Sequence, residues 1–275
     1  MDIYTSTSYK IGELLTKRYS TSFSTSSRLF SSNIRKHIYA IYALVRIADE
    51  VVDTYSDHLS SSRLKVLESD VYEAIRTRYS TNPIVHAFAH TVNTYVIDQK
   101  LIKAFFESMK MDLEPKKFTE KMYKKYIYGS AEVVGLMCLA VFCDTDTALY
   151  KKLESGARSL GAAYQKVNFL RDLSNDYNKL HRVYFPNYTY ESFDDNSKKE
   201  IIEDIQKNFY NAKVALNELP KSSRTAVSVS YNYYKYLLKK LERTPVEIIK
   251  RRRIRIANST KLSLLITTLI IEIIK

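Results

Sequence analysis

One uninterrupted run, residues 147–182, constrains the fold of this chain more than any other feature. It contains no proline, and its residues favour helix. Positions four apart on a helix lie one above the other on the same face. Two carboxylates at that spacing repel each other, so a cation must lie beside them. The polar side chains that share this face are Gln165, Asn168, Asp172 and Asp176, with Arg171 next to them.

A second carboxylate pair with the same spacing lies in an earlier helical pattern, residues 33–55. Asp49 and Asp53 share one face, and the apolar Tyr42 and Val45 precede them on it, so this face points inward. A buried carboxylate pair is unfavourable unless a cation neutralises it. Two such helices facing each other would place four carboxylates around one cavity. Oxygen ligands of this kind suit Mg²⁺, with Mn²⁺ as a substitute.

The scarcity of glycine and proline favours an all-α protein. Only 5 of each occur in 275 residues, and the prolines fall between helical patterns, where proline starts or stops helices. No Gly-rich phosphate loop is present, which argues against a nucleotide-binding α/β fold. We predict one domain, residues 1–275. The expected helices are 9–19, 33–55, 62–79, 84–111, 118–142, 147–182, 198–219, 221–241 and 245–256, with residues 20–27 as a Ser/Thr-rich loop.

The charge of the chain is strongly basic. Lysine and arginine exceed aspartate and glutamate by 43 to 30, a net charge of +13, and residues 250–255 read KRRRIR. Such a balance favours phosphates, nucleic acids or anionic membranes as partners. No nucleic-acid module accompanies the basic segment, so we expect diphosphates and a peripheral membrane surface, and no nucleic acid.

Other features of the sequence bear on compartment and metals. Two cysteines, Cys138 and Cys143, are too few for a disulfide framework and indicate the cytoplasm. His86 and His90 have a metal-compatible spacing, but no third ligand is visible, so we interpret them as ordinary histidines. The apolar tail, residues 261–275, is shorter than the roughly 20 residues that span a bilayer. It is therefore expected to be a packed or interfacial helix.

Three segments in this order resemble the squalene/phytoene synthase family. They are residues 42–53, 126–135 and 161–176, the last continuing to Pro186. One DxxxD pair alone is common on solvated helices, whereas two pairs with a QxxNxxRDxxxD frame and a tyrosine segment between them are specific. The resemblance implies a single-domain isoprenoid-synthase-type helical bundle around a central cavity.

The resemblance also implies roles for individual residues. Metal ligands would be Asp49, Asp53, Asp172 and Asp176, with Asn168. Arg46 and Tyr126 would join these aspartates as catalytic residues. In the family the stretch at residues 20–27 acts as a flap over the diphosphate, although here it could equally be a flexible connector. The substrate-binding residues would be Ser22, Phe23, Arg46, Tyr126, Gln165, Asn168, Arg171, Arg182, Tyr184 and Tyr234.

The activity implied by the resemblance is a Mg²⁺-dependent head-to-head (1′–1) condensation of two prenyl diphosphates by a monomer. The expected reaction converts two geranylgeranyl diphosphates to phytoene through a cyclopropyl diphosphate, without NADPH. A dehydrosqualene or squalene synthase that uses farnesyl diphosphate is the alternative. A third possibility is a non-catalytic relative that acts as an assembly factor. Glu132 replaces a small residue of the family, and if it faced the cavity it would polarise or shorten the channel.

Overall fold

The computed structural model describes residues 1–54, 58–114, 118–180 and 182–274. Within these ranges the regular structure is helical, so the prediction of an all-α fold is confirmed. The helices are α1 (Ile3–Tyr19), α2 (Thr21–Ser27), α3 (Ser32–Asp49), η1 (Glu50–Thr54), α4 (Ser60–Thr77), α5 (Pro83–Tyr95), α6 (Gln99–Asp112), α7 (Glu120–Ile127), η2 (Tyr128–Glu132), α8 (Val133–Cys143), α9 (Thr147–Leu180), α10 (Asp195–Glu218), α11 (Lys221–Glu242), α12 (Val246–Arg251) and α13 (Asn258–Ile274).

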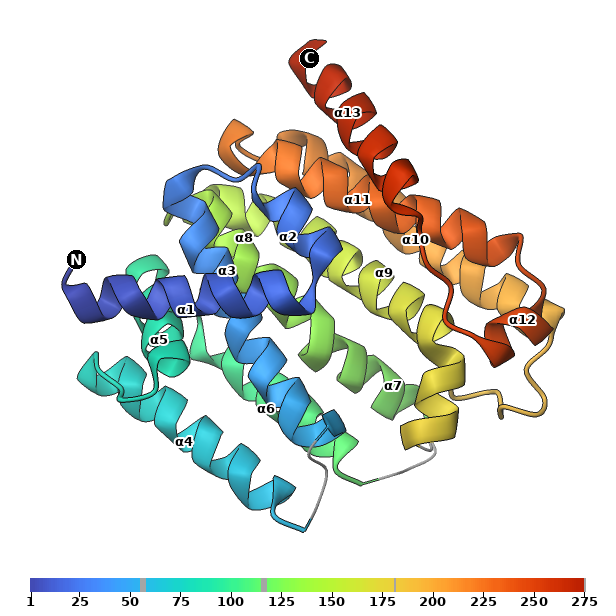
Figure 1. Ribbon diagram of the computed structural model, residues 1–275, viewed down its shortest axis with the longest axis horizontal. Helices are drawn as coiled ribbons and strands as arrows, with labels where there is room; N and C mark the ends of the chain where they lie inside the picture. The colour runs from blue at the N-terminus through green and yellow to red at the C-terminus, as the bar shows by residue number, and fades with distance from the viewer. Residues whose placement is uncertain (55–57, 115–117, 181, 275) are drawn as a thin grey trace.

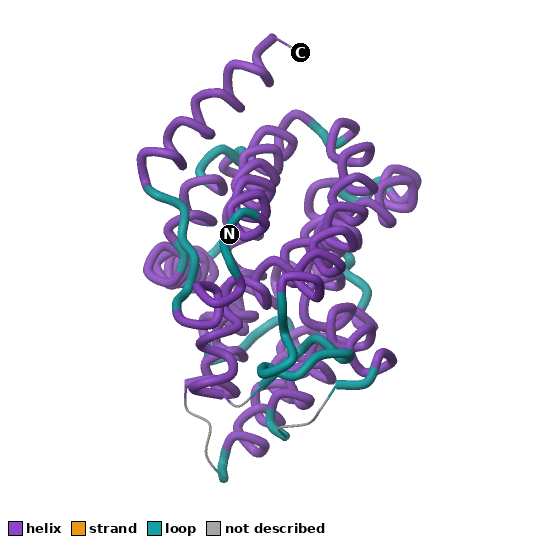
Figure 2. Tube along the Cα trace, turned by 90° about the vertical axis from the view of Figure 1, so that its right-hand side faces the viewer, coloured by secondary structure: helices purple, strands orange, loops and turns teal. Residues whose placement is uncertain are grey.

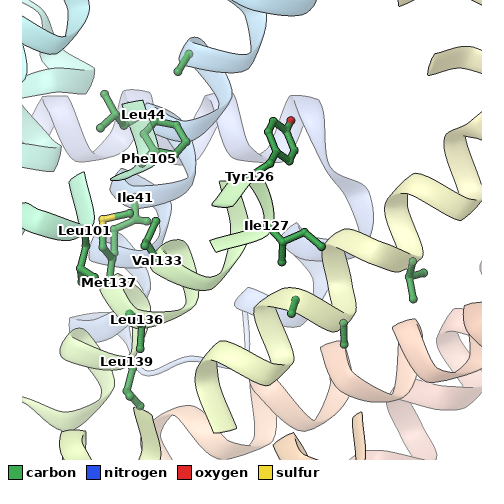
Figure 3. Close-up of a cluster of buried hydrophobic side chains, with 14 of the residues drawn as sticks. Ile41, Leu44, Leu101, Phe105, Tyr126, Ile127, Val133, Leu136, Met137 and Leu139 are labelled. Atoms are coloured by element: carbon green, nitrogen blue, oxygen red, sulfur yellow. The ribbon is translucent and has the colours of Figure 1, made fainter. Parts of the chain in front are cut away.

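The helices form one bundle in which α8 lies between α3 and α9 (Figures 1 and 2). Helix α10 packs along α9, while α1 and α5 pack against α3. A single cluster of buried apolar side chains runs from Phe30 to Ile254. Figure 3 shows its centre, where Ile41 from α3 and Phe105 from α6 meet the side chains of α8, with Tyr126 at the edge. This packing holds α3 and α9, which carry the two aspartate pairs, in fixed positions.

Glycines allow α9 to approach its neighbours closely. A Cβ atom on Gly161 would lie 2.6 Å from the carbonyl oxygen of Ala131 in η2. A Cβ atom on Gly156 would lie 2.1 Å from the Cβ atom of Ala215 in α10. Real Cβ atoms do not come this close to other atoms, so these contacts exclude any side chain larger than hydrogen.

Two of the predicted helices contain π-helical segments that the sequence pattern did not reveal. Segment η1 follows α3 and carries Asp53, and segment η2 joins α7 to α8. A π segment accommodates an extra residue in a helical turn and is frequent at functional sites. In this protein Asp49 is the last residue of α3 and Asp53 lies within η1.

The prediction of a loop at residues 20–27 was wrong, because these residues form α2. The Ser20 side chain caps the helix by accepting a hydrogen bond from the Phe23 N–H at 3.2 Å. The Ser27 hydroxyl donates to the Phe23 carbonyl at 2.6 Å. Hydroxyl groups that bond to a preceding turn can satisfy themselves inside a helix, which propensity alone does not anticipate.

Other predicted helices have different bounds, and the helix expected at 9–19 begins at Ile3. The run 84–111 is interrupted at Val96, whose φ of 50° is left-handed, and Asp98 then caps α6 by accepting from Lys100 N at 2.8 Å. The predicted helix 245–256 ends at Arg251. Beyond it the chain is extended, because Ile254 turns into the core and is buried.

The two histidines with metal-like spacing belong to a hydrogen-bond network beneath α1. The Tyr9 hydroxyl lies 2.9 Å from His90 Nδ1 and 3.0 Å from His37 Nδ1. His86 Nε2 lies 2.8 Å from the Thr5 hydroxyl. Burial lowers the pKa of both His86 and His90, which favours their neutral forms. They fasten α1 to α5.

The contact between α9 and α10 can be tested by moving one methyl group across it. We expect Gly156→Ala to destabilise the protein by about 1–3 kcal/mol, because the added Cβ overlaps Ala215. The double substitution Gly156→Ala/Ala215→Gly should recover most of that loss, since the overlapping methyl group is gone. Gly12→Ala is the control, because its Cβ would meet Ala43 at an ordinary 3.6 Å. Unfolding free energies from urea titration give the comparison, and equal effects of Gly156→Ala and Gly12→Ala would contradict it.

Candidate functional site

The first aspartate pair lies where α3 passes into η1. Arg46, one turn earlier on α3, donates to Glu50 and lies 3.8 Å from the Asp49 carboxylate. Burial, together with the charge of Asp53, raises the pKa of Asp49 to about 8. The negative charge of ionised Asp49 is therefore only partly neutralised by the cations around it. The Arg46 Nε–H is buried and has no hydrogen-bond partner among the described residues.

Arg182 connects this pair to the rest of the site. Its guanidinium donates to the Asp53 carboxylate at 2.6 Å and to the Val52 carbonyl at 3.1 Å. It also donates to the Asp112 carbonyl at 2.8 Å and to the Tyr184 hydroxyl at 3.3 Å. The side chain is almost wholly buried. It therefore ties η1 and α6 to the chain that leaves α9.

Asp112, at the end of α6, was not identified from the sequence. Its side chain is 4% exposed and accepts hydrogen bonds from the Tyr126 hydroxyl at 2.6 Å and the Tyr184 hydroxyl at 3.1 Å. Burial raises the pKa of Asp112 to about 6, and nearby Arg182 opposes that shift. No spacing in the sequence could reveal this residue, because its partners are brought together only by the packing of α6, α7 and the segment after α9.

The second aspartate pair lies on α9, and cations cover one of its members. Arg171 contacts the Asp172 carboxylate at 2.5 and 3.0 Å. Arg253 contacts the same carboxylate at 2.7 Å. It comes from the extended segment after α12, where the sequence analysis expected helix. These arginines supply the cation that the repulsion between Asp172 and Asp176 requires.

Asp176 lies within electrostatic range of its partner on α9, Asp172, and of Asp53 in η1. Burial, Asp172 and Asp53 all raise its pKa, to about 8, while Arg182 and Arg171 lower it less. The two helices thus place their carboxylates within electrostatic range of one another. Across the described ranges, no three acidic, histidine or cysteine side chains converge closely enough to hold a metal ion as they stand.

The donor chemistry of this region nevertheless fits a divalent cation. The carboxyl groups of Asp49 and Asp176 both have raised pKa values, because they are buried and lie near other carboxylates. A hard cation would stabilise their charged forms, and carboxylate oxygens are its preferred ligands. Arginine side chains at the same place suit phosphate oxygens, which they can bind in pairs.

Aromatic rings form one wall beside the carboxylates. Phe169 of α9 stacks on Tyr184 with ring centroids 4.1 Å apart, and Tyr126 lies 5.1 Å from Tyr184. All three are buried. Since the hydroxyls of Tyr126 and Tyr184 both donate to Asp112, this carboxylate fixes the orientation of the wall.

The remaining predicted residues lie along α9 and in α2. Asn168 accepts a hydrogen bond from the Tyr234 hydroxyl of α11 at 3.2 Å. Gln165 donates to the Ser130 hydroxyl of η2 at 3.3 Å. On α2, Phe23 stacks on Tyr42 of α3 with ring centroids 4.9 Å apart. Ser22 lies on the same short helix and its carbonyl accepts from Ser26.

Glu132 does not lie with the aspartate pairs. Its carboxylate accepts a hydrogen bond from Arg158 Nε of α9 at 2.7 Å. The Arg158 guanidinium in turn lies over the Tyr128 ring, 5.3 Å from its centroid. These contacts bind η2 to α9, so Glu132 has a partner that accounts for its departure from a small residue.

Replacement of Asp112 tests how far this site depends on its buried carboxylate. We expect Asp112→Ala to lower the unfolding free energy by about 3–5 kcal/mol, because two buried tyrosine hydroxyls lose their acceptor and Arg182 loses one of its two carboxylates. The control is Glu191→Ala, which removes an exposed acceptor of the Tyr177 hydroxyl and should leave the unfolding free energy almost unchanged. Chemical denaturation measures both. Similar losses in the two variants would contradict the prediction.

Comparison with known sequences agrees with these features. A phytoene synthase from Arthrospira platensis is 27% identical over an alignment that covers 90% of this chain and 88% of that protein. A 4,4′-diapophytoene synthase from Staphylococcus haemolyticus (strain JCSC1435) is 28% identical over 64% of this chain. That match covers 61% of the staphylococcal enzyme, less than two thirds of its length.

Solved structures show the same fold. A dehydrosqualene synthase crystallised with a ligand superposes with a TM-score of 0.82 over 96% of both chains, at 18% identity. The squalene synthase HpnC from Alicyclobacillus acidocaldarius has a TM-score of 0.76 over 92% of this chain and 98% of its own, at 17% identity. The squalene/phytoene synthase family model matches residues 16–260. The chain therefore belongs to the squalene/phytoene synthase family.

Proposed function

We propose that this protein is a prenyltransferase that joins two prenyl diphosphates head to head (1′–1). One observation carries the proposal. Two aspartate pairs on α3–η1 and α9 lie within electrostatic range of each other, and arginines from four places in the chain surround them. Membership of the squalene/phytoene synthase family supports this interpretation. A non-catalytic scaffold would have no need for so many inadequately neutralised carboxylates beside an aromatic wall.

The substrate we favour is geranylgeranyl diphosphate, with phytoene as the product. The support is the similarity to the phytoene synthase from Arthrospira platensis, which extends over 90% of this chain. Farnesyl diphosphate is the second candidate. It is favoured by the similarity to a 4,4′-diapophytoene synthase and by the shared fold with a dehydrosqualene synthase.

The residues of the site divide into two groups by their chemistry. Asp49, Asp53, Asp172 and Asp176, with Asn168, would hold Mg²⁺ or Mn²⁺. The bound metal supplies positive charge to the diphosphate leaving group. Arginines would hold the phosphate oxygens, because a guanidinium binds them in pairs. These arginines are Arg46, Arg171 and Arg182. Arg253, which contacts Asp172 in this structure, is the fourth.

Arg46 has a specific reason to bind a phosphate oxygen. Its Nε–H is buried without a partner in the described part of the chain, and an unsatisfied buried donor is costly. A diphosphate oxygen would satisfy it. The Arg46 guanidinium also lies over the Tyr19 ring, 4.5 Å from its centroid, which limits its movement.

The apolar walls would protect the allylic cation after the diphosphate leaves. Tyr126, Phe169 and Tyr184 form a buried aromatic surface beside the carboxylates. Such a surface excludes water, which would quench a carbocation, and aromatic rings attract cations. The condensation would proceed through a cyclopropyl diphosphate and end with loss of a proton. That ending requires no reductant, so NADPH is not a substrate in this proposal.

The decisive experiment is incubation of the purified protein with Mg²⁺ and either geranylgeranyl or farnesyl diphosphate. We expect phytoene from the longer substrate without NADPH, identified by mass spectrometry of the hydrocarbon extract. A C30 product from the shorter substrate alone would retain the head-to-head reaction and reject phytoene. If folded protein with Mg²⁺ gave no hydrocarbon from either substrate, the enzymatic proposal would fail.

A single carboxylate substitution tests the role of the second aspartate pair. We expect Asp172→Asn to lower the rate of product formation by at least about 10²-fold, because charge stabilisation at the diphosphate is lost. Asp204→Asn is the matched control on α10, where Asp204 pairs with Lys166 at 2.5 Å. It should leave the rate within about twofold, because Asp204 lies outside the site and Lys166 keeps its hydrogen bond to the Asn208 side chain at 2.8 Å. Circular dichroism verifies that both variants are folded, and a fully active Asp172→Asn would exclude this role.

A further inference from the structure

Helix α13 (Asn258–Ile274) packs against the body through polar side chains. Glu272 accepts hydrogen bonds from Arg224 Nε at 3.1 Å and from the Ser228 hydroxyl at 3.2 Å, both in α11. Its side chain is only 5% exposed. The Asn232 amide donates to the Thr268 hydroxyl at 2.8 Å. The hydrogen bonds that hold α13 to the body therefore come from Thr268 and Glu272, beside half-buried Leu265.

The apolar side chains of α13 face outward. Leu262 is 57% exposed, Ile266 50%, Ile270 52% and Ile273 82%, and these positions lie on one stripe of the helix. Ile271 and Ile274 extend the exposed surface. Both views show α13 rising away from the other helices toward the C-terminus (Figures 1 and 2).

This orientation is opposite to that of a surface helix in a water-soluble protein, which buries its apolar side against the core. Contiguous exposed apolar surface of this kind marks an interaction site. The polar seam between α13 and α11 is specific, since it uses a buried carboxylate and its arginine partner. The helix is therefore held with its apolar side outward by defined contacts.

A basic segment directly precedes α13. Arg251, Arg252, Arg253 and Arg255 are all exposed, and Arg253 among them pairs with Asp172 of the site. Exposed arginines beside an apolar helix complement the charge of anionic lipid headgroups, at about 1 kcal/mol for each residue near the surface. The same combination of apolar stripe and adjacent cations defines helices that lie in the plane of a membrane.

We propose that α13 inserts its exposed isoleucine and leucine side chains into the headgroup region of an anionic membrane, with Arg251, Arg252 and Arg255 contacting the phosphates. The chemistry of the stripe favours lipid over a protein partner, because protein hot spots are enriched in tryptophan, tyrosine and arginine, and leucine is under-represented in them. The described part of α13 carries no tryptophan, tyrosine or arginine on that stripe.

The helix would lie on the membrane surface, because Thr268 and Glu272 attach its other side to α11. Elsewhere in the described chain, the continuous helical run Glu120–Cys143 is long and apolar enough to cross a membrane, but 56% of its most apolar window is buried inside the protein, as in a core helix.

Fluorescence offers a direct test, because the chain contains no tryptophan. Ile270→Trp places a single reporter on the exposed stripe, and Val66→Trp places one at a similarly exposed site on α4. With vesicles containing phosphatidylglycerol, we expect the emission of the first variant to shift to the blue and that of the second to remain unchanged. No shift at position 270, or equal shifts in both variants, would overturn the proposal.

Vesicle co-sedimentation separates the apolar and charged contributions. We expect Ile266→Ser/Ile270→Ser to weaken binding at least about tenfold, since each buried aliphatic side chain is worth more than one kcal/mol. Val66→Ser/Val214→Ser removes two equally exposed apolar side chains elsewhere and should change nothing. Arg251→Gln/Arg252→Gln should weaken binding to anionic vesicles, whereas Lys65→Gln/Lys207→Gln, on α4 and α10, should not.

The alternative occupant of this surface is a second copy of the chain. Analytical ultracentrifugation of the same variants distinguishes it. A wild-type dimer that dissociates on Ile266→Ser/Ile270→Ser, together with no vesicle binding, would overturn the membrane proposal. Unchanged sedimentation of the two proteins without lipid, together with the loss of vesicle binding, would support it. Neither measurement depends on the activity of the site.

Discussion

The structure depends on how the protein compensates the repulsion between the carboxylates that α3–η1 and α9 hold close together. Asp49, Asp53 and Asp176 bring three carboxyl groups into a partly buried space, and the protein supplies only part of the positive charge that would neutralise their ionised forms. The most deeply buried of the compensating cations is Arg182, which lies outside both helices. This arginine also donates hydrogen bonds to backbone carbonyls of η1 and α6. It therefore both neutralises carboxylates and fixes the path of the chain.

Close helix packing makes that arrangement possible. Gly161 lets α9 approach η2 until only a hydrogen fits between them, and Gly156 does the same for α9 and α10. The π segments η1 and η2 lie beside the site, where each accommodates an extra residue within a helical run. Asp53 lies within η1, where its carboxylate accepts a hydrogen bond from Arg182.

The segment after α12 links the site to the outer surface. Arg253 points to Asp172, and neighbouring arginines face outward beside the apolar stripe of α13. Helix α13 is attached to the body by Glu272 and other polar groups, which leaves its aliphatic side chains available. In our proposals a membrane-bound α13 would hold the site close to the bilayer, where substrates with long prenyl chains are most soluble.

Periodicity and composition in the sequence determined the all-α fold, and spacing alone placed both aspartate pairs on helix faces, because both depend on neighbours within a few residues. The tertiary structure decided what depends on distant partners. Asp112 and Arg253 joined the site through packing, the serine-rich stretch became α2 through its own hydroxyl bonds, and the run at 84–111 divided at Val96. The outward face of α13 belongs here too, because an apolar pattern specifies a helix face, and only the contacts of Glu272 specify the direction in which that face points.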